Sequence, residues 1–83
     1  PAKIALYPNP SSEKTTIGIN LDETSDISVT LRNINGQIVL NELYRNVSGF
    51  KTIEISTKHL STGIYSVEVQ HKNKIERLKL TVN

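Results

Sequence analysis

The sequence contains no cysteine, methionine or tryptophan, and it has only one phenylalanine and four glycines. Without cysteine, the chain can form neither a disulfide nor a thiolate zinc site, and it has no thiol nucleophile. Its core must therefore hold the fold without covalent links. No apolar stretch approaches the ~18 residues that span a bilayer, and no basic-then-apolar export signal stands at the N-terminus. We expect no membrane insertion.

The chain also lacks a strong excess of charge and has little alanine. Ten Lys and Arg residues against eight Asp and Glu residues leave a net charge of +2, which bears on solubility and little else. Alanine occurs twice, whereas Val, Ile and Thr supply 24 of the 83 residues. These β-branched residues are typical of half-buried strands. The length predicts one domain over residues 1–83. Because the chain starts with Pro1, we expect it to be a piece of a longer protein.

Apolar and polar residues alternate along most of the chain, and no window of ten or more residues shows a helical period of 3.6. One example is the run in which Ile17, Ile19 and Leu21 are separated by Thr, Gly and Asn. A period of two predicts antiparallel strands with one face on a core. We predict seven strands, near residues 4–7, 14–21, 26–33, 37–44, 50–56, 63–71 and 74–82. Seven short strands without helices predict an all-β, immunoglobulin-like antiparallel β-sandwich.

Turn-forming residues are predicted to separate these strands. Residues 22–25 and 48–49 are interpreted as breaks because they are polar or contain glycine. Asn35 and Gly36 predict a tight hairpin, since both tolerate positive φ. If the hairpin loop has two residues, its turn is of type I′.

A tyrosine near the start of one strand predicts a tyrosine corner, a feature of Greek-key sandwiches. Leu60, Gly63 and Tyr65 lie in a segment that leads from a loop into the strand. The Tyr65 ring is expected to be buried between sheets, and its hydroxyl to bond a backbone group a few residues upstream. Gly63 supplies the backbone conformation that this corner needs. The motif stabilises the fold and binds nothing.

No group of residues has the spacing of a catalytic site. His59 and His71 are the only histidines, and we expect both to be solvated in loops or at strand ends. Asp22, Glu23 and Asp26 form an acidic turn, but their spacing differs from that of known calcium loops. We therefore predict a domain that is not an enzyme and needs no metal or cofactor.

Basic residues gather in the last predicted hairpin, at Lys72, Lys74, Arg77 and Lys79. Such a cluster is compatible with a nucleic-acid or anion site. It has no interleaved aromatic residues, so we favour a solvated edge that discourages strand pairing. We predict no nucleic-acid partner.

Several short motifs follow one another in a fixed order. They are Tyr7-Pro8-Asn9-Pro10, then Asn35-Gly36, then Leu60-x-x-Gly63-x-Tyr65, and finally Arg77-Leu78-Lys79-Leu80-Thr81-Val82-Asn83. In this order the sequence resembles the type IX secretion system C-terminal sorting domain, type A, also called the Por secretion tail domain. The resemblance spans residues 6–83.

The resemblance implies a function as well as an immunoglobulin-like sandwich of about seven strands. Such domains are the last domain of proteins exported by Bacteroidota. An outer-membrane translocon recognises them, and a sortase-like peptidase usually cleaves before them, after which the cargo is anchored at the cell surface. The implied localisation is the periplasm in transit, then the cell surface or the extracellular space. The resemblance places the translocation signal mainly in residues 77–83.

An alternative function is a fibronectin-III-like adhesion or carbohydrate-binding module. Sugar-binding sandwiches usually present exposed aromatic residues, on which sugar rings stack. Here Tyr65 is assigned to the core, and Tyr7, Tyr44 and Phe50 are not contiguous in sequence. We therefore favour the sorting signal, and we expect a monomer.

Overall fold

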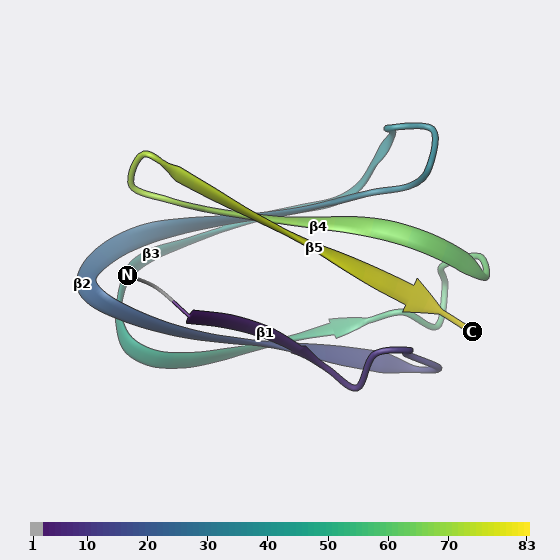
Figure 1. The fold of residues 1–83 in the computed structure, drawn as a ribbon, viewed down its shortest axis with the longest axis horizontal. Helices are drawn as coiled ribbons and strands as arrows, with labels where there is room; N and C mark the ends of the chain where they lie inside the picture. Colours follow the sequence, from purple (N-terminus) through teal and green to yellow (C-terminus); the bar gives the residue numbers. More distant parts are fainter. Residues whose placement is uncertain (1–2) are drawn as a thin grey trace.

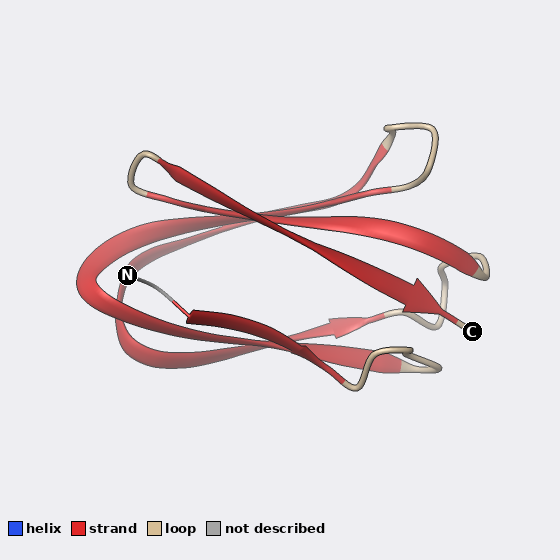
Figure 2. Ribbon diagram, viewed as in Figure 1, coloured by secondary structure: helices blue, strands red, loops and turns tan. Residues whose placement is uncertain are grey.

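The computed structural model describes residues 3–83, and strands make up most of it (Figure 1). The strands are β1 (Lys3–Tyr7), β2 (Lys14–Arg32), β3 (Ile38–Ser56), β4 (Gly63–His71) and β5 (Lys74–Val82). Figure 2 shows strands and loops without a helix over the described residues, which confirms the all-β prediction. Accordingly, no helix within residues 3–83 has the length and hydropathy to cross a membrane.

All five strands belong to one antiparallel sheet. The first half of β2 pairs with β1, its second half pairs with β4, and β3 accompanies it along most of its length. β5 pairs with β4 alone and lies at an edge. The sheet curls midway along β2 and β3, so that its two halves face each other (Figure 1). One half holds β1, and the other holds β4 and β5.

The prediction of seven strands is wrong, because two predicted breaks lie inside continuous strands. Residues 14–21 and 26–33 together form β2, and residues 37–44 and 50–56 together form β3. The predicted sandwich is not confirmed, since ladder hydrogen bonds join both halves in a single curled sheet. The two last strands, in contrast, have the predicted bounds.

The residues that we interpreted as breaks bend the strands instead of ending them. Four residue steps of β2, from Leu21 to Ser25, lie opposite only two steps of β3, from Gly49 to Val47. Extra residues on one strand of a pair increase its bend. On β3, Gly49 has a φ of 64° and Asn46 a φ of 55°. Both strands therefore turn sharply while their pairing continues on either side.

The core lies between the two halves of the sheet. It consists of Ile17, Ile19, Leu21, Ile27, Val29, Leu31, Val47, Ile53, Ile55, Tyr65, Val67, Val69, Leu80 and Val82. Full burial of one such aliphatic side chain stabilises a fold by about 1.5–3 kcal/mol. These contacts hold the domain in the absence of disulfides.

His71 is buried, so the prediction that it is solvated is wrong. It continues the inward-facing series of β4 after Val67 and Val69, and only 7% of its surface is exposed. His59 is exposed, as expected. The alternation that places Val69 inward also places His71 inward, although a turn follows immediately.

The loop between β2 and β3 contains Asn35 and Gly36, but its turn is not of type I′. The Gly36 N–H donates to the Asn33 carbonyl (2.9 Å), and the Asn33 N–H donates to the Gln37 carbonyl (3.0 Å). Ile34 and Asn35 are thus the central residues, and Gly36 alone among the loop residues has a positive φ (82°). This is a three-residue hairpin loop with glycine in the left-handed position.

Tyr65 makes the hydrogen bond that the sequence predicts. Its side chain is buried, and its hydroxyl donates to the Ser61 carbonyl oxygen at 2.7 Å. Gly63, between the two, has a φ of 154°, which favours glycine. Leu60 is half-buried against the core at the same corner.

Candidate functional site

The inward face of β5 packs on the core at its C-terminal end. Leu80 and Val82 are buried, as the alternation predicts, and Asn83 after them is exposed. Leu78, which has the same place in the alternation, is only partly buried. β5 is thus held by the core most firmly over its last residues.

The outward face of β5 carries two exposed cations in different surroundings. Arg77 Nε lies 3.3 Å from a carboxylate oxygen of Glu68 on β4, and the other Glu68 oxygen lies 3.5 Å from Arg32 Nε on β2. Lys79 takes part in none of the ion pairs formed within residues 3–83. Thr81, the next outward residue, is half-buried. Arg77 therefore shares a carboxylate with Arg32, whereas Lys79 is the cation of this outward face that has no ion-pair partner among residues 3–83.

Residues 8–11, which we call the 8–11 segment, run beside the end of β5. The Asn9 side-chain amide donates from Nδ2 to the Lys79 carbonyl (2.8 Å) and accepts at Oδ1 from the Thr81 N–H (3.0 Å). The Ser11 N–H then donates to the Thr81 carbonyl, and the Asn83 N–H donates to the Ser11 carbonyl, each at 2.8 Å. Two motifs near opposite ends of the sequence therefore form one structural unit.

The same segment is anchored to the other half of the sheet. The buried hydroxyls of Ser11 and Thr57 are 2.7 Å apart, and the Thr15 hydroxyl donates to the Pro8 carbonyl (3.1 Å). The Tyr7-Pro8 and Asn9-Pro10 peptide bonds are cis. The 8–11 segment thus connects β5 to the half of the sheet that contains β1.

Tyr7 covers the neighbouring strand instead of the core. A Cβ atom at Gly18 of β2 would lie 3.2 Å from the Tyr7 hydroxyl oxygen. The ring therefore lies tightly against Gly18, and a side chain there would displace it by a few tenths of an ångström; the ring remains 46% exposed. Tyr7 protects the outer surface of β2, a role that its sequence position did not indicate.

A family model described as secretion system C-terminal sorting domain matches residues 5–83. The chain belongs to this family of type IX sorting domains. No curated protein matches the sequence. Family membership makes the chain a C-terminal sorting signal for type IX secretion, within a secreted protein bound for the cell surface or the extracellular space. The family is one of sorting signals and not of enzymes.

The matched range contains the motifs that carry the resemblance, and it also contains residues whose contacts the sequence did not predict. Ser11 and Thr57 bond each other across 46 positions of the sorting domain, and Glu68 links two arginines on its neighbouring strands. Alternation marks Glu68 as outward-facing, but no sequence signal identifies its partners. A serine directly after the Pro-Asn-Pro motif was the only available clue to Ser11.

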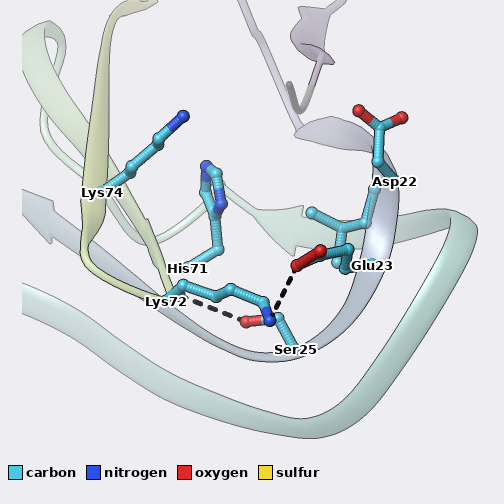
Figure 3. Close-up of a pocket in the computed structure, with 7 residues that line it drawn as sticks. Asp22, Glu23, Ser25, His71, Lys72 and Lys74 are labelled. Atoms are coloured by element: carbon cyan, nitrogen blue, oxygen red, sulfur yellow. Dashed lines mark hydrogen bonds and ion pairs between the residues drawn. The ribbon is translucent and has the colours of Figure 1, made fainter.

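A pocket of about 290 Å³ lies beside the bend of β2 in the sorting domain (Figure 3). Figure 3 shows Lys72 reaching across it, with its ammonium 3.0 Å from a Glu23 carboxylate oxygen and its backbone N–H donating to the Ser25 hydroxyl (3.2 Å). His71 Nε2 is buried, has no hydrogen-bond partner within residues 3–83, and lies 3.8 Å from a Glu76 oxygen. In the described part of the chain, no three His, Asp or Glu residues gather to hold a metal ion.

Proposed function

We propose that residues 1–83 form the last domain of a larger exported protein and act as its address. An outer-membrane translocon of the type IX system binds the domain after the cargo has reached the periplasm. A sortase-like peptidase then cleaves before the domain, and the cargo is anchored at the cell surface. The domain acts as a monomer without a cofactor, and it neither inserts into the membrane nor binds nucleic acid.

The observation that carries this proposal is the family match over residues 5–83. The match extends across all of β5 and nearly all of the curled sheet. We assign translocon recognition to the last seven residues, which are Arg77, Leu78, Lys79, Leu80, Thr81, Val82 and Asn83. Exposed Lys79 and Asn83 support this assignment, because a partner can reach them without unfolding the sheet.

The adhesion or carbohydrate-binding alternative has less support. Tyr7 lies opposite Thr16 of β2, and Phe50 lies opposite Asn20. Four residues along a strand correspond to roughly 13 Å, so these exposed rings do not form one stacking platform. Tyr44 lies in the other half of the sheet, opposite Ile27.

A reporter fusion tests the proposed function. Residues 1–83 are fused to the C-terminus of a periplasmic reporter in a host with a working type IX system, and surface and periplasmic reporter are quantified. We expect the parent fusion to reach the surface, and the mass of the released reporter to show cleavage before the domain. A chain ending at Ile75 should stay in the periplasm. If the parent fusion stays in the periplasm while a known sorting domain exports the same reporter, the proposal is wrong.

A double charge reversal, Arg77→Glu with Lys79→Glu, tests the assigned recognition strand. Both side chains are exposed, so we expect a folded domain that exports poorly. A folded double variant that exports like the parent would exclude direct recognition of this basic edge.

A further inference from the structure

The hydrogen bonds between the 8–11 segment and β5 follow the pattern of a parallel β-ladder. Ser11 is bridged in parallel to Val82, donating to the residue before it and accepting from the residue after it. In a continued ladder, the backbone N–H and C=O of residue 9 would bond the Lys79 carbonyl and the Thr81 N–H. The Asn9 side chain makes these two bonds instead. A carboxamide can do this because it carries both a donor and an acceptor.

These bonds lie on the edge of β5 that faces away from β4, and they continue one residue beyond the β4–β5 ladder. That ladder ends with Gly63 opposite Val82, so Asn83 lies beyond it, whereas Lys79 and Thr81 are also paired with β4. The backbone N–H of Asn83 is held by Ser11, and that of Thr81 by Asn9. Strand ends open locally at low free-energy cost unless they are tied down. The 8–11 segment supplies this tie for Asn83 and adds hydrogen bonds along the second edge of β5 at Lys79 and Thr81.

We propose that Asn9 is a positioning residue of the export signal, which is therefore discontinuous in sequence. Through Asn9 the 8–11 segment holds residues 79–83 extended and in one register, so that the exposed side chains of Lys79 and Asn83 meet the translocon in a fixed arrangement. This inference rests on the proposed function and extends it to a second segment about 70 residues away. The translocon reads the end of β5 only when the 8–11 segment lies beside it.

Asn9 is suited to this role because its contribution is local. Both of its bonds to β5 are solvent-exposed, and Leu80 and Val82 stay buried without them. Removal of the Asn9 side chain should therefore loosen residues 79–83 more than it destabilises the domain. A residue with a purely structural role would instead affect export only in proportion to lost stability.

The test compares Asn9→Ala with Ile53→Val in the full fusion protein. Ile53 is buried in the half of the sheet that lacks β5, so its variant loses stability without removing a hydrogen bond to β5. Denaturant unfolding ranks the stability of both variants, and surface reporter is measured at a temperature at which both are folded. Hydrogen exchange is followed at Thr81, Asn83 and, as a reference for global opening, Val67.

We expect Asn9→Ala to lower surface reporter at least tenfold relative to Ile53→Val, and to speed exchange at Thr81 at least tenfold with little change at Val67. If Asn9→Ala unfolds, Asn9→Asp replaces it, since this variant keeps the acceptor for Thr81 and loses the donor to Lys79. Equal export by the Asn9 variant and Ile53→Val would overturn the inference and leave the proposed function standing. Failure of the parent fusion itself would overturn both.

Discussion

Replacement of Tyr65 by phenylalanine measures what its corner hydrogen bond contributes to the fold. The Tyr65 ring is 6% exposed, and its hydroxyl donates to the Ser61 carbonyl at 2.7 Å. A single hydrogen bond contributes about 1 kcal/mol net. Because Ser61 is exposed, water can satisfy its carbonyl in the variant, and no buried group is left unpaired. We therefore expect Tyr65→Phe to cost about 1 kcal/mol.

Tyr65→Ala should cost several times more. It removes a ring that lies among core residues and opposite Leu80 in the β4–β5 ladder. Truncation of a buried aromatic residue to alanine costs about 3–5 kcal/mol. For a domain of this size, about 1 kcal/mol corresponds to a shift in Tm of roughly 4–8 °C. The two variants are thus easily separated in one series of thermal scans.

Tyr44→Phe provides a matched control for the hydroxyl. The Tyr44 hydroxyl also donates a short hydrogen bond, at 2.6 Å, but to the exposed carboxylate of Glu42. We expect a change of less than about 0.5 kcal/mol, since solvent replaces an exposed bond easily. Equal destabilisation by Tyr65→Phe and Tyr44→Phe would contradict the argument, as would a Tyr65→Ala domain that melts within a degree or two of the parent.

Three further predictions concern a turn, a charged edge and a titration. Gly36→Val should lower the free energy of unfolding in urea by more than about 1 kcal/mol, because the φ of 82° disfavours a β-branched residue. The cost is one of backbone conformation, since no atom lies within 4 Å of the added Cβ. A neutral result would mean that the loop rearranges freely. Arg77→Glu should cost about 0.5–1 kcal/mol of stability, since it replaces the ion pair with Glu68 by a like-charge contact. Lys79→Glu should be nearly neutral. The reverse order of the two costs would contradict the ion-pair assignment. Burial and the neighbouring Glu42 carboxylate raise the pKa of Tyr44 to about 12. The contribution of the neutral Tyr44 hydroxyl to the free energy of unfolding is therefore complete below about pH 10, and it is lost as the pH rises through about 12. Absorbance titration should show one late tyrosine that Tyr44→Phe removes, and a late phase that survives this change would be incompatible with the assignment.

Alternation was sufficient to predict β4 and β5 because each has one face on the core and their pairing has no register shift. It failed at residues 22–25 and 48–49, where polar residues and glycine occur in bends as well as in turns. The difference between the two depends on pairing between β2 and β3 across the bend, which is a non-local property. His71 was wrongly predicted to be solvated because a turn follows it, although it has the same place in the alternation as the buried Val69.

The candidate site could be predicted only in parts. The resemblance identified Asn9 and residues 77–83 separately, but no local pattern indicates that Asn9 bonds Lys79 across 70 positions. The same holds for the contact of Glu68 with Arg32 and Arg77. Alternation predicts which face of the sheet a side chain lies on, but it does not predict which residues lie beside it. Side-chain hydrogen bonds between distant segments depend on the register of the whole sheet, which single-sequence patterns do not specify.

The geometry of the two ends of the domain bears on its response to tension. β1 begins toward one end of the long axis, and β5 ends at the other (Figure 1). A force that pulls these ends apart acts along both strands. It shears the antiparallel β1–β2 ladder and the bonds between the 8–11 segment and β5, so several hydrogen bonds must yield together instead of opening one at a time. A load applied between the two ends of the domain would therefore act in its mechanically resistant direction.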